Sequence, residues 1–171
     1  MKDRRGFTII ELLVTLAIAA IILTVAVPGF RNVILDNRLA SQANQFLTSN
    51  KLARSAAIRF QRNAIICIST SYDAAVPACT AGTDWSNGWI VWVDKDRDAA
   101  TDANEIVAVF APLAGSSTLT SQAVSEFTYD ARGFVNVGDE LTLCDDRSGE
   151  TGRIIRVNAV GRTNISRSGC D

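Results

Sequence analysis

The chain has 171 residues, enough for one compact domain with an appendage and too few for two ordinary domains. Its net charge of −1 points to no class of partner, and the absence of histidine removes the commonest general base and metal ligand. No G-x-S-x-G motif, phosphate-binding loop or spaced nucleophile–base pair is present, so we expect no enzyme, with no catalytic residue, cofactor or metal ligand assigned.

The N-terminus combines a short basic leader, MKDRRG, with an almost unbroken apolar segment. From Phe7 to Val27 this segment has 21 residues, roughly 30 Å as a helix, which is enough to cross a membrane. The leader's positive charges favour the cytoplasmic side, so the rest of the chain is expected outside. An ordinary signal peptide does not fit, because the segment is too long and no small-residue cleavage site closes it. Glu11 lies inside this segment at a cost of about 2–3 kcal/mol, and therefore needs a partner or a function.

The pattern Gly6-Phe7-Thr8 with Glu11, followed by apolar residues, resembles the class III signal of the type IV pilin superfamily. The resemblance implies that a prepilin peptidase cleaves after Gly6 and methylates the new amino terminus of Phe7. It also implies that Glu11 pairs with the N-terminal amine of a neighbouring pilin during assembly, which would compensate a buried charge. Pro28 matches the position of the family's helix kink. The expected partners are other pilins or pseudopilins, the prepilin peptidase and the inner membrane.

Residues 31–61 keep a helical period. We expect the apolar face of this helix to pack on the domain's own sheet, with Asp36, Arg38, Gln42 and Lys51 largely off that face. The apolar face comprises Leu35, Leu39, Ala43, Phe46, Ala53, Ala57 and Phe60.

After Asn63 the pattern changes to short β-branched or aromatic segments separated by turn residues. The expected strands are Ala64–Ser69, Gly88–Val93, Glu105–Phe110, Phe127–Tyr129, Glu140–Cys144, Arg153–Val157 and Arg162–Ile165. Asn158–Gly161 is predicted to be a hairpin turn in which Gly161 supplies a positive φ. The fold class is therefore α+β, with a long N-terminal helix covering one antiparallel sheet. The predicted organisation is a leader at 1–6, a transmembrane and assembly helix at 7–28, and a periplasmic domain at 29–171.

The C-terminal part resembles the GspH/FimT branch of the superfamily. The residues that carry the resemblance are Trp85–Asp94, the acidic turn to Glu105, Leu143–Asp145, Val160–Arg162 and Cys170. It implies a FimT-like minor pilin of a type IV pilus, anchored in the bacterial inner membrane. An H-type pseudopilin of a type II secretion system is the alternative, because the two share the whole scaffold. An adhesin has little support, since the loops are short.

Four cysteines allow three disulfide pairings. The local pairing, Cys67–Cys79 with Cys144–Cys170, needs the least rearrangement and matches the GspH/FimT branch. A zinc site would require C-x-x-C spacing, which is absent.

Residues 94–105 follow the ligand spacing of an EF-hand loop, with acids at positions one, three, five, nine and twelve. Ala99 replaces the glycine of position six, the flanking segments are strands, and Lys95 and Arg97 can neutralise the acids. We interpret the segment as a solvated hairpin loop, and calcium binding stays an unassigned alternative.

The C-terminal segment is locally basic, with Arg147, Arg153, Arg156, Arg162 and Arg167. FimT-like pilins that take up DNA carry a G-R-x-R motif near this end. Here Asn164 stands where the second arginine is expected, and Arg167 is the candidate substitute. Arg153 and Arg156 face opposite sides of a strand, so not all of these residues share a surface. The hypothesis is weak, non-specific and salt-sensitive duplex DNA binding through Arg162 and Arg167, helped by Arg156 or Arg153; the alternative is a solvated face.

Overall fold

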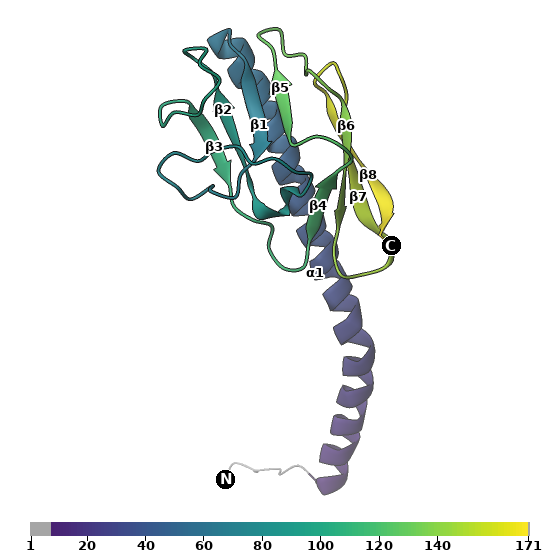
Figure 1. Ribbon diagram of the computed structural model, residues 1–171. Helices are drawn as coiled ribbons and strands as arrows, with labels where there is room; N and C mark the ends of the chain where they lie inside the picture. The colour runs from purple at the N-terminus through teal and green to yellow at the C-terminus, as the bar shows by residue number, and fades with distance from the viewer. Residues whose placement is uncertain (1–7, 171) are drawn as a thin grey trace. The chain divides into compact units, whose positions relative to one another are not determined.

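The computed structural model describes residues 8–170 (Figure 1), and the chain divides into two compact units, Met1–Asn37 and Arg38–Asp171. The helix α1, Ile9–Phe60, contributes to both units. Pro28, the expected end of the assembly helix, lies within α1. Gly6 and Phe7 lie outside the described residues.

Local sequence signals set both the start and the end of α1. At the start, Thr8 Oγ1 accepts a hydrogen bond from the Glu11 amide at 3.3 Å, and T-x-x-E is the capping-box pattern. At the end, Gln61 has a φ of 54°, and the Arg62 amide bonds to the Ala57 carbonyl at 3.3 Å. That bond, which spans five residues across a left-handed residue, is a Schellman motif and ends the helix.

The second unit contains two four-stranded antiparallel sheets rather than the single sheet expected from the sequence (Figure 1). The first has the order β3-β2-β1-β5, with β1 Ala64–Ile68, β2 Trp89–Val93, β3 Ile106–Phe110 and β5 Glu126–Tyr129. The second has the order β4-β6-β7-β8, with β4 Thr118–Ser121, β6 Asp139–Cys144, β7 Gly149–Val157 and β8 Thr163–Cys170. Every pair of neighbouring strands is antiparallel.

The expected strands are present with shifted ends, and β4 is an addition. β4 reads Thr-Leu-Thr-Ser, too short and polar to stand out as a strand, but its pairing with β6 places Leu119 in the core. β7 and β8 extend beyond the expected segments, through a register shift between Gly149 and Gly152. The predicted hairpin turn is confirmed: Gly161 has a φ of 73°, and its amide bonds to the Asn158 carbonyl at 2.8 Å.

The helix and both sheets share one hydrophobic core. The prediction for α1 is confirmed at Leu39, Ala43, Phe46, Ala53 and Ala57, which are all buried in it. It was wrong at two positions. Phe60 is 39% exposed and lies under the cations of Arg59 and Lys95, while Gln42 is buried and donates to the Ala114 carbonyl at 3.0 Å.

The W-x-x-G-W segment has a packing explanation. Trp85 and Trp89 are both fully buried, with ring centroids 5.4 and 5.5 Å from that of Phe46 on α1. Gly88 has a φ of 105°, and a Cβ there would lie 2.7 Å from the Phe110 carbonyl oxygen. The glycine therefore lets the chain turn between two large core side chains while β3 lies close by.

Candidate functional sites

The first unit presents an apolar helical surface. An 18-residue window of α1 has a mean hydropathy of 2.7 and no buried residue, which makes this helix long and apolar enough to cross a membrane. Its large apolar side chains stay exposed, among them Ile10, Leu13, Leu16, Ile21 and Phe30. Such a surface requires lipid or other apolar helices around it.

Glu11 lies in the first turn of α1 and is exposed. A carboxylate at this position interacts favourably with the positive end of the helix dipole, and it is the third helical residue of the capping box. Glu11 therefore has a local role in starting the helix, besides the pairing role that the resemblance implies. The capping role does not depend on charge, because glutamine also serves in a capping box. The pairing role does, because only a carboxylate can form an ion pair with an amine.

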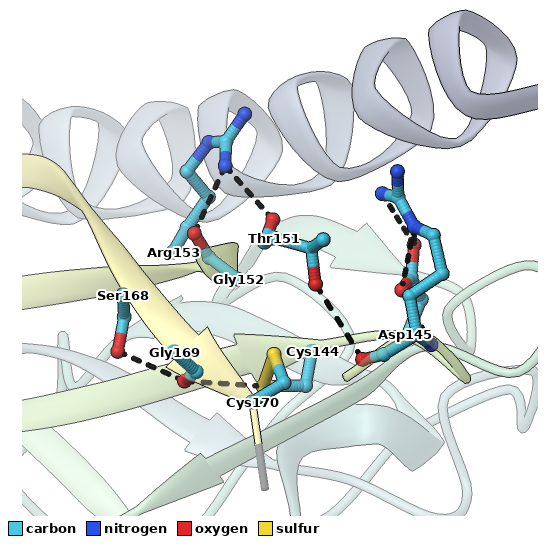
Figure 2. Close-up of a disulfide and its surroundings, with 9 residues drawn as sticks. Cys144, Asp145, Thr151, Gly152, Arg153, Ser168, Gly169 and Cys170 are labelled. Atoms are coloured by element: carbon cyan, nitrogen blue, oxygen red, sulfur yellow. Dashed lines mark hydrogen bonds and ion pairs between the residues drawn. A yellow bond between two sulfur atoms is a disulfide. The ribbon is translucent and has the colours of Figure 1, made fainter. Parts of the chain in front are cut away.

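The C-terminal arginines are distributed over different surfaces. Arg153 and Arg167 lie directly opposite each other on β7 and β8, so they share one face of the sheet. Arg153 Nη1 donates to the carbonyls of Thr151 and Gly152, both at 2.9 Å (Figure 2). Arg156 is on the opposite face, ion-paired with Glu140. The structure therefore separates Arg156 from the other predicted DNA contacts, and its charge is already compensated.

Arg162 lies in a groove that sequence reasoning did not find. The groove has a volume of about 230 Å³ and contains Lys51 and Arg54 of α1 beside Arg162. Leu47, Gly161 and Thr163 complete its lining, which includes no carboxylate. Lys51 and Arg54 are three residues apart and thus share a helix face, and that spacing was the only available signal. We call Lys51, Arg54 and Arg162 the basic groove.

The buried ring of Tyr129 lies beside Gly161 of this groove, and its hydroxyl donates to Asn50 Oδ1 at 2.7 Å. Burial raises the pKa of Tyr129 to about 12, against the opposing effects of Thr163 and Arg54. The phenol is therefore neutral at physiological pH. Its hydrogen bond to Asn50 joins β5 to α1.

The acidic loop between β2 and β3 brings part of its EF-hand pattern together. One carboxylate oxygen from each of Asp94, Asp96 and Asp98 lies within 4.8 Å of the others. Asp102 and Glu105 are not in this group, and Glu105 is buried.

The disulfides in the structure are Cys67–Cys79 and Cys144–Cys170, the local pairing, with Cα–Cα distances of 5.5 and 5.8 Å. The second one joins the end of β6 to the end of β8 (Figure 2). Gly152 lies against it, and a Cβ there would be 2.5 Å from the Cys170 sulfur. The bridge ties the C-terminal strand to the middle of its sheet.

Comparisons with known proteins agree with this architecture. Residues 42–161 match the family model described as type II transport protein GspH, and residues 1–27 match the prokaryotic N-terminal methylation motif. No curated protein matches the chain. Two crystal structures of the type IV minor pilin FimU from Pseudomonas aeruginosa are similar to it. They have TM-scores of 0.59 and 0.57 at 19% and 18% identity, covering 76% and 75% of this chain and 89% and 92% of theirs.

A long N-terminal helix packed on antiparallel sheets, behind an N-terminal methylation motif, defines a pilin-like subunit. The family match extends over most of the domain, so the chain belongs to the GspH family. It is a pilin-like member of that family that carries a prokaryotic N-terminal methylation motif.

Proposed function

We propose that this chain is a FimT-like minor pilin of a type IV pilus, made as a prepilin and held in the bacterial inner membrane before assembly. Its C-terminal domain then lies in the periplasm, and its fibre partners are other pilins. The observation that carries the proposal is the methylation motif at residues 1–27, continuous with an exposed apolar helix that begins at a capped Glu11 turn. The fold likeness to a type IV minor pilin fits this proposal, and the description of the family model as a type II transport protein fits the alternative, so the deletion phenotype given below decides between them.

Processing gives the first test. Prepilin peptidase should remove MKDRRG and leave an N-methylated Phe7, so mass spectrometry of the membrane fraction should find a methylated peptide that begins at Phe7. Gly6→Ala should block cleavage. An intact Met1 in protein that still supports assembly would refute the proposal.

The role of Glu11 can be tested with variants that separate charge from helix capping. Glu11→Gln keeps a capping-box residue and removes the charge, whereas Thr8→Ala removes the cap and keeps the charge. If Glu11 pairs with a neighbour's amine, Glu11→Gln should insert into the membrane but fail to enter sheared fibres, and Thr8→Ala should assemble. The opposite outcome would assign Glu11 to helix initiation alone.

The alternative, an H-type pseudopilin, predicts a different phenotype. Deleting the gene in its own bacterium should abolish pilus-dependent motility and leave protein secretion intact if the chain is a minor pilin. Loss of secretion with normal piliation would identify the pseudopilin. Complementation with the wild-type gene controls for effects on neighbouring genes.

We further propose weak, sequence-indifferent binding of duplex DNA. The basic groove supports this, because Lys51, Arg54 and Arg162 gather without a carboxylate in its lining. Arg153 and Arg167 also lie directly opposite each other on β7 and β8, and an anionic partner would reduce the repulsion between two such like charges. Phosphate contacts carry no base information, so binding should not depend on sequence.

Gel-shift titration tests this second proposal. Lys51→Ala and Arg162→Ala should each weaken binding, and affinity should fall with salt at a logarithmic slope of roughly −3 if three phosphates are contacted. Arg59→Ala removes an exposed cation outside the groove and should bind as wild type does. Arg167→Ala reports whether the β8 cation contributes. If Arg59→Ala and Arg162→Ala shift DNA equally well in the gel, the groove is an ordinary solvent-exposed surface and not a DNA-binding site.

A further inference from the structure

The loop between β2 and β3 has the length and acid spacing of a calcium loop. Its first, third and fifth residues are Asp94, Asp96 and Asp98, and its twelfth is Glu105. In EF-hand loops these positions supply side-chain oxygens, and the twelfth supplies both oxygens of one carboxylate. Here the three aspartate carboxylates already converge within 4.8 Å of one another.

The environment of Glu105 is a second, independent indication that a cation binds here. It is only 2% exposed, and its Oε2 is buried without a hydrogen-bond partner. Its Oε1 accepts a hydrogen bond from the Lys95 amide at 2.6 Å, so the carboxyl group lies against the main chain that carries Asp94 and Asp96. A buried carboxylate oxygen with no partner is costly, and a cation beside it removes that cost.

The two cations of the loop do not occupy this position. Lys95 directs its ammonium to the Asn104 carbonyl and to the ring of Phe60, 5.3 Å from the ring centroid. Within residues 8–170, no ion pair joins Lys95 or Arg97 to the three aspartates. The negative charge of the cluster is therefore left for an external cation.

The sixth position explains how the loop turns without glycine. Ala99 has a φ of 61°, the left-handed conformation that an EF-hand loop requires at this place. Alanine reaches it at a conformational cost, so replacing Ala99 by glycine should favour the loop conformation that binds the ion.

We propose that residues 94–105 bind one calcium ion through Asp94, Asp96, Asp98 and Glu105. Hard oxygen ligands, several of them carboxylates, in an irregular loop suit calcium better than magnesium, which demands a smaller octahedral site. Two hydrogen bonds hold the loop at the end of α1: the Asp94 amide donates to the Asn63 carbonyl at 3.0 Å, and the Arg62 side-chain Nε donates to the Lys95 carbonyl at 3.2 Å. Calcium would thus stabilise the connection of β2 to β3 at that end of the domain.

Isothermal titration of the full-length chain in detergent, stripped with EDTA, tests the proposal. Calcium chloride should show saturable binding of one ion per chain, with a Kd of about 10⁻⁴ to 10⁻³ M, the range of extracellular modules. The same additions should raise the melting temperature. Magnesium chloride at equal concentration should give little heat and little shift.

Variants identify the ligands. Asp96→Asn, at an exposed position that should not disturb folding, should weaken calcium binding roughly tenfold or more. Glu105→Gln should do the same, and Ala99→Gly should strengthen it. The matched control is Asp73→Asn, which removes the same charge from an exposed position in another loop and should bind as wild type does. Absence of saturable binding, equal response to magnesium, or equal weakening in Asp73→Asn would overturn the proposal.

Discussion

Replacing Tyr129 by phenylalanine should destabilise the domain at neutral pH. The hydroxyl of Tyr129 donates to Asn50 Oδ1 at 2.7 Å, and Asn50 Nδ2 donates to the Phe46 carbonyl at 2.9 Å. Tyr129 and Asn50 are 0% and 2% exposed, so no water replaces the lost donor. The variant leaves Asn50 Oδ1 buried and unsatisfied, which should lower the free energy of unfolding by roughly 1–3 kcal/mol.

The same substitution should have a different effect in alkali. The pKa of Tyr129 is about 12 in the folded chain, against an ordinary value of 10.0, because the buried phenolate is poorly solvated. Since the folded pKa is the higher one, the unfolded chain ionises first. The contribution of the neutral phenol is complete below pH 10 and is lost as the pH rises through 12. By pH 11.5 the wild type should have lost roughly 2 kcal/mol that the phenylalanine variant cannot lose.

Urea unfolding followed by tryptophan fluorescence can measure the loss of stability at neutral pH and its change in alkali, because Trp85 and Trp89 are buried beside α1. Wild type and Tyr129→Phe are compared at pH 7 and pH 11.5, with Tyr72→Phe as the control for the other tyrosine. The stability gap between wild type and Tyr129→Phe should be clear at pH 7 and should close or reverse at pH 11.5. A gap that stays constant with pH would refute the argument from burial.

Four further predictions concern the second sheet and the disulfides. Non-reducing peptide mapping should recover both disulfides and no free thiol, and a cross-pairing would contradict the strand order. Replacing Cys144 and Cys170 by serine should lower the free energy of unfolding by roughly 3–4 kcal/mol, because this disulfide spans 26 residues. Gly161→Ala should cost roughly 1–3 kcal/mol in urea unfolding, because its φ is 73° and its Cβ would collide with a main-chain carbonyl oxygen, so an unchanged midpoint would contradict the turn. Burial alone would raise the pKa of Asp145, but hydrogen bonds from Arg147 outweigh it and hold the pKa below its ordinary value. The stability that the ionised Asp145 contributes is therefore present above about pH 4 and lost on acidification. Asp145→Asn should consequently lose less stability in acid than wild type does.

The sequence by itself determined that the N-terminal part of the chain is a helix of the pilin type, long and apolar enough to span a membrane, and that the remainder is an α+β domain. An almost unbroken apolar segment of this length fits few structures other than a membrane-spanning helix, and the position of Glu11 after Gly6 made the pilin resemblance specific. The apolar face of α1 was predictable because a helical period depends on neighbours three and four residues away. Most strands were predictable for the same reason: alternation and turn residues act locally.

Tertiary structure alone decided what depends on pairing between distant segments. Whether the strands form one sheet or two follows from β4 pairing with β6 and not with β5, and a four-residue polar strand carries almost no local signal of its partner. The burial of Gln42 and the exposure of Phe60 likewise depend on which segments happen to cover α1. The basic groove forms because the turn at Arg162 comes to lie beside Lys51 and Arg54. Charges so far apart in sequence meet only through the packing of the whole domain, which no local pattern encodes.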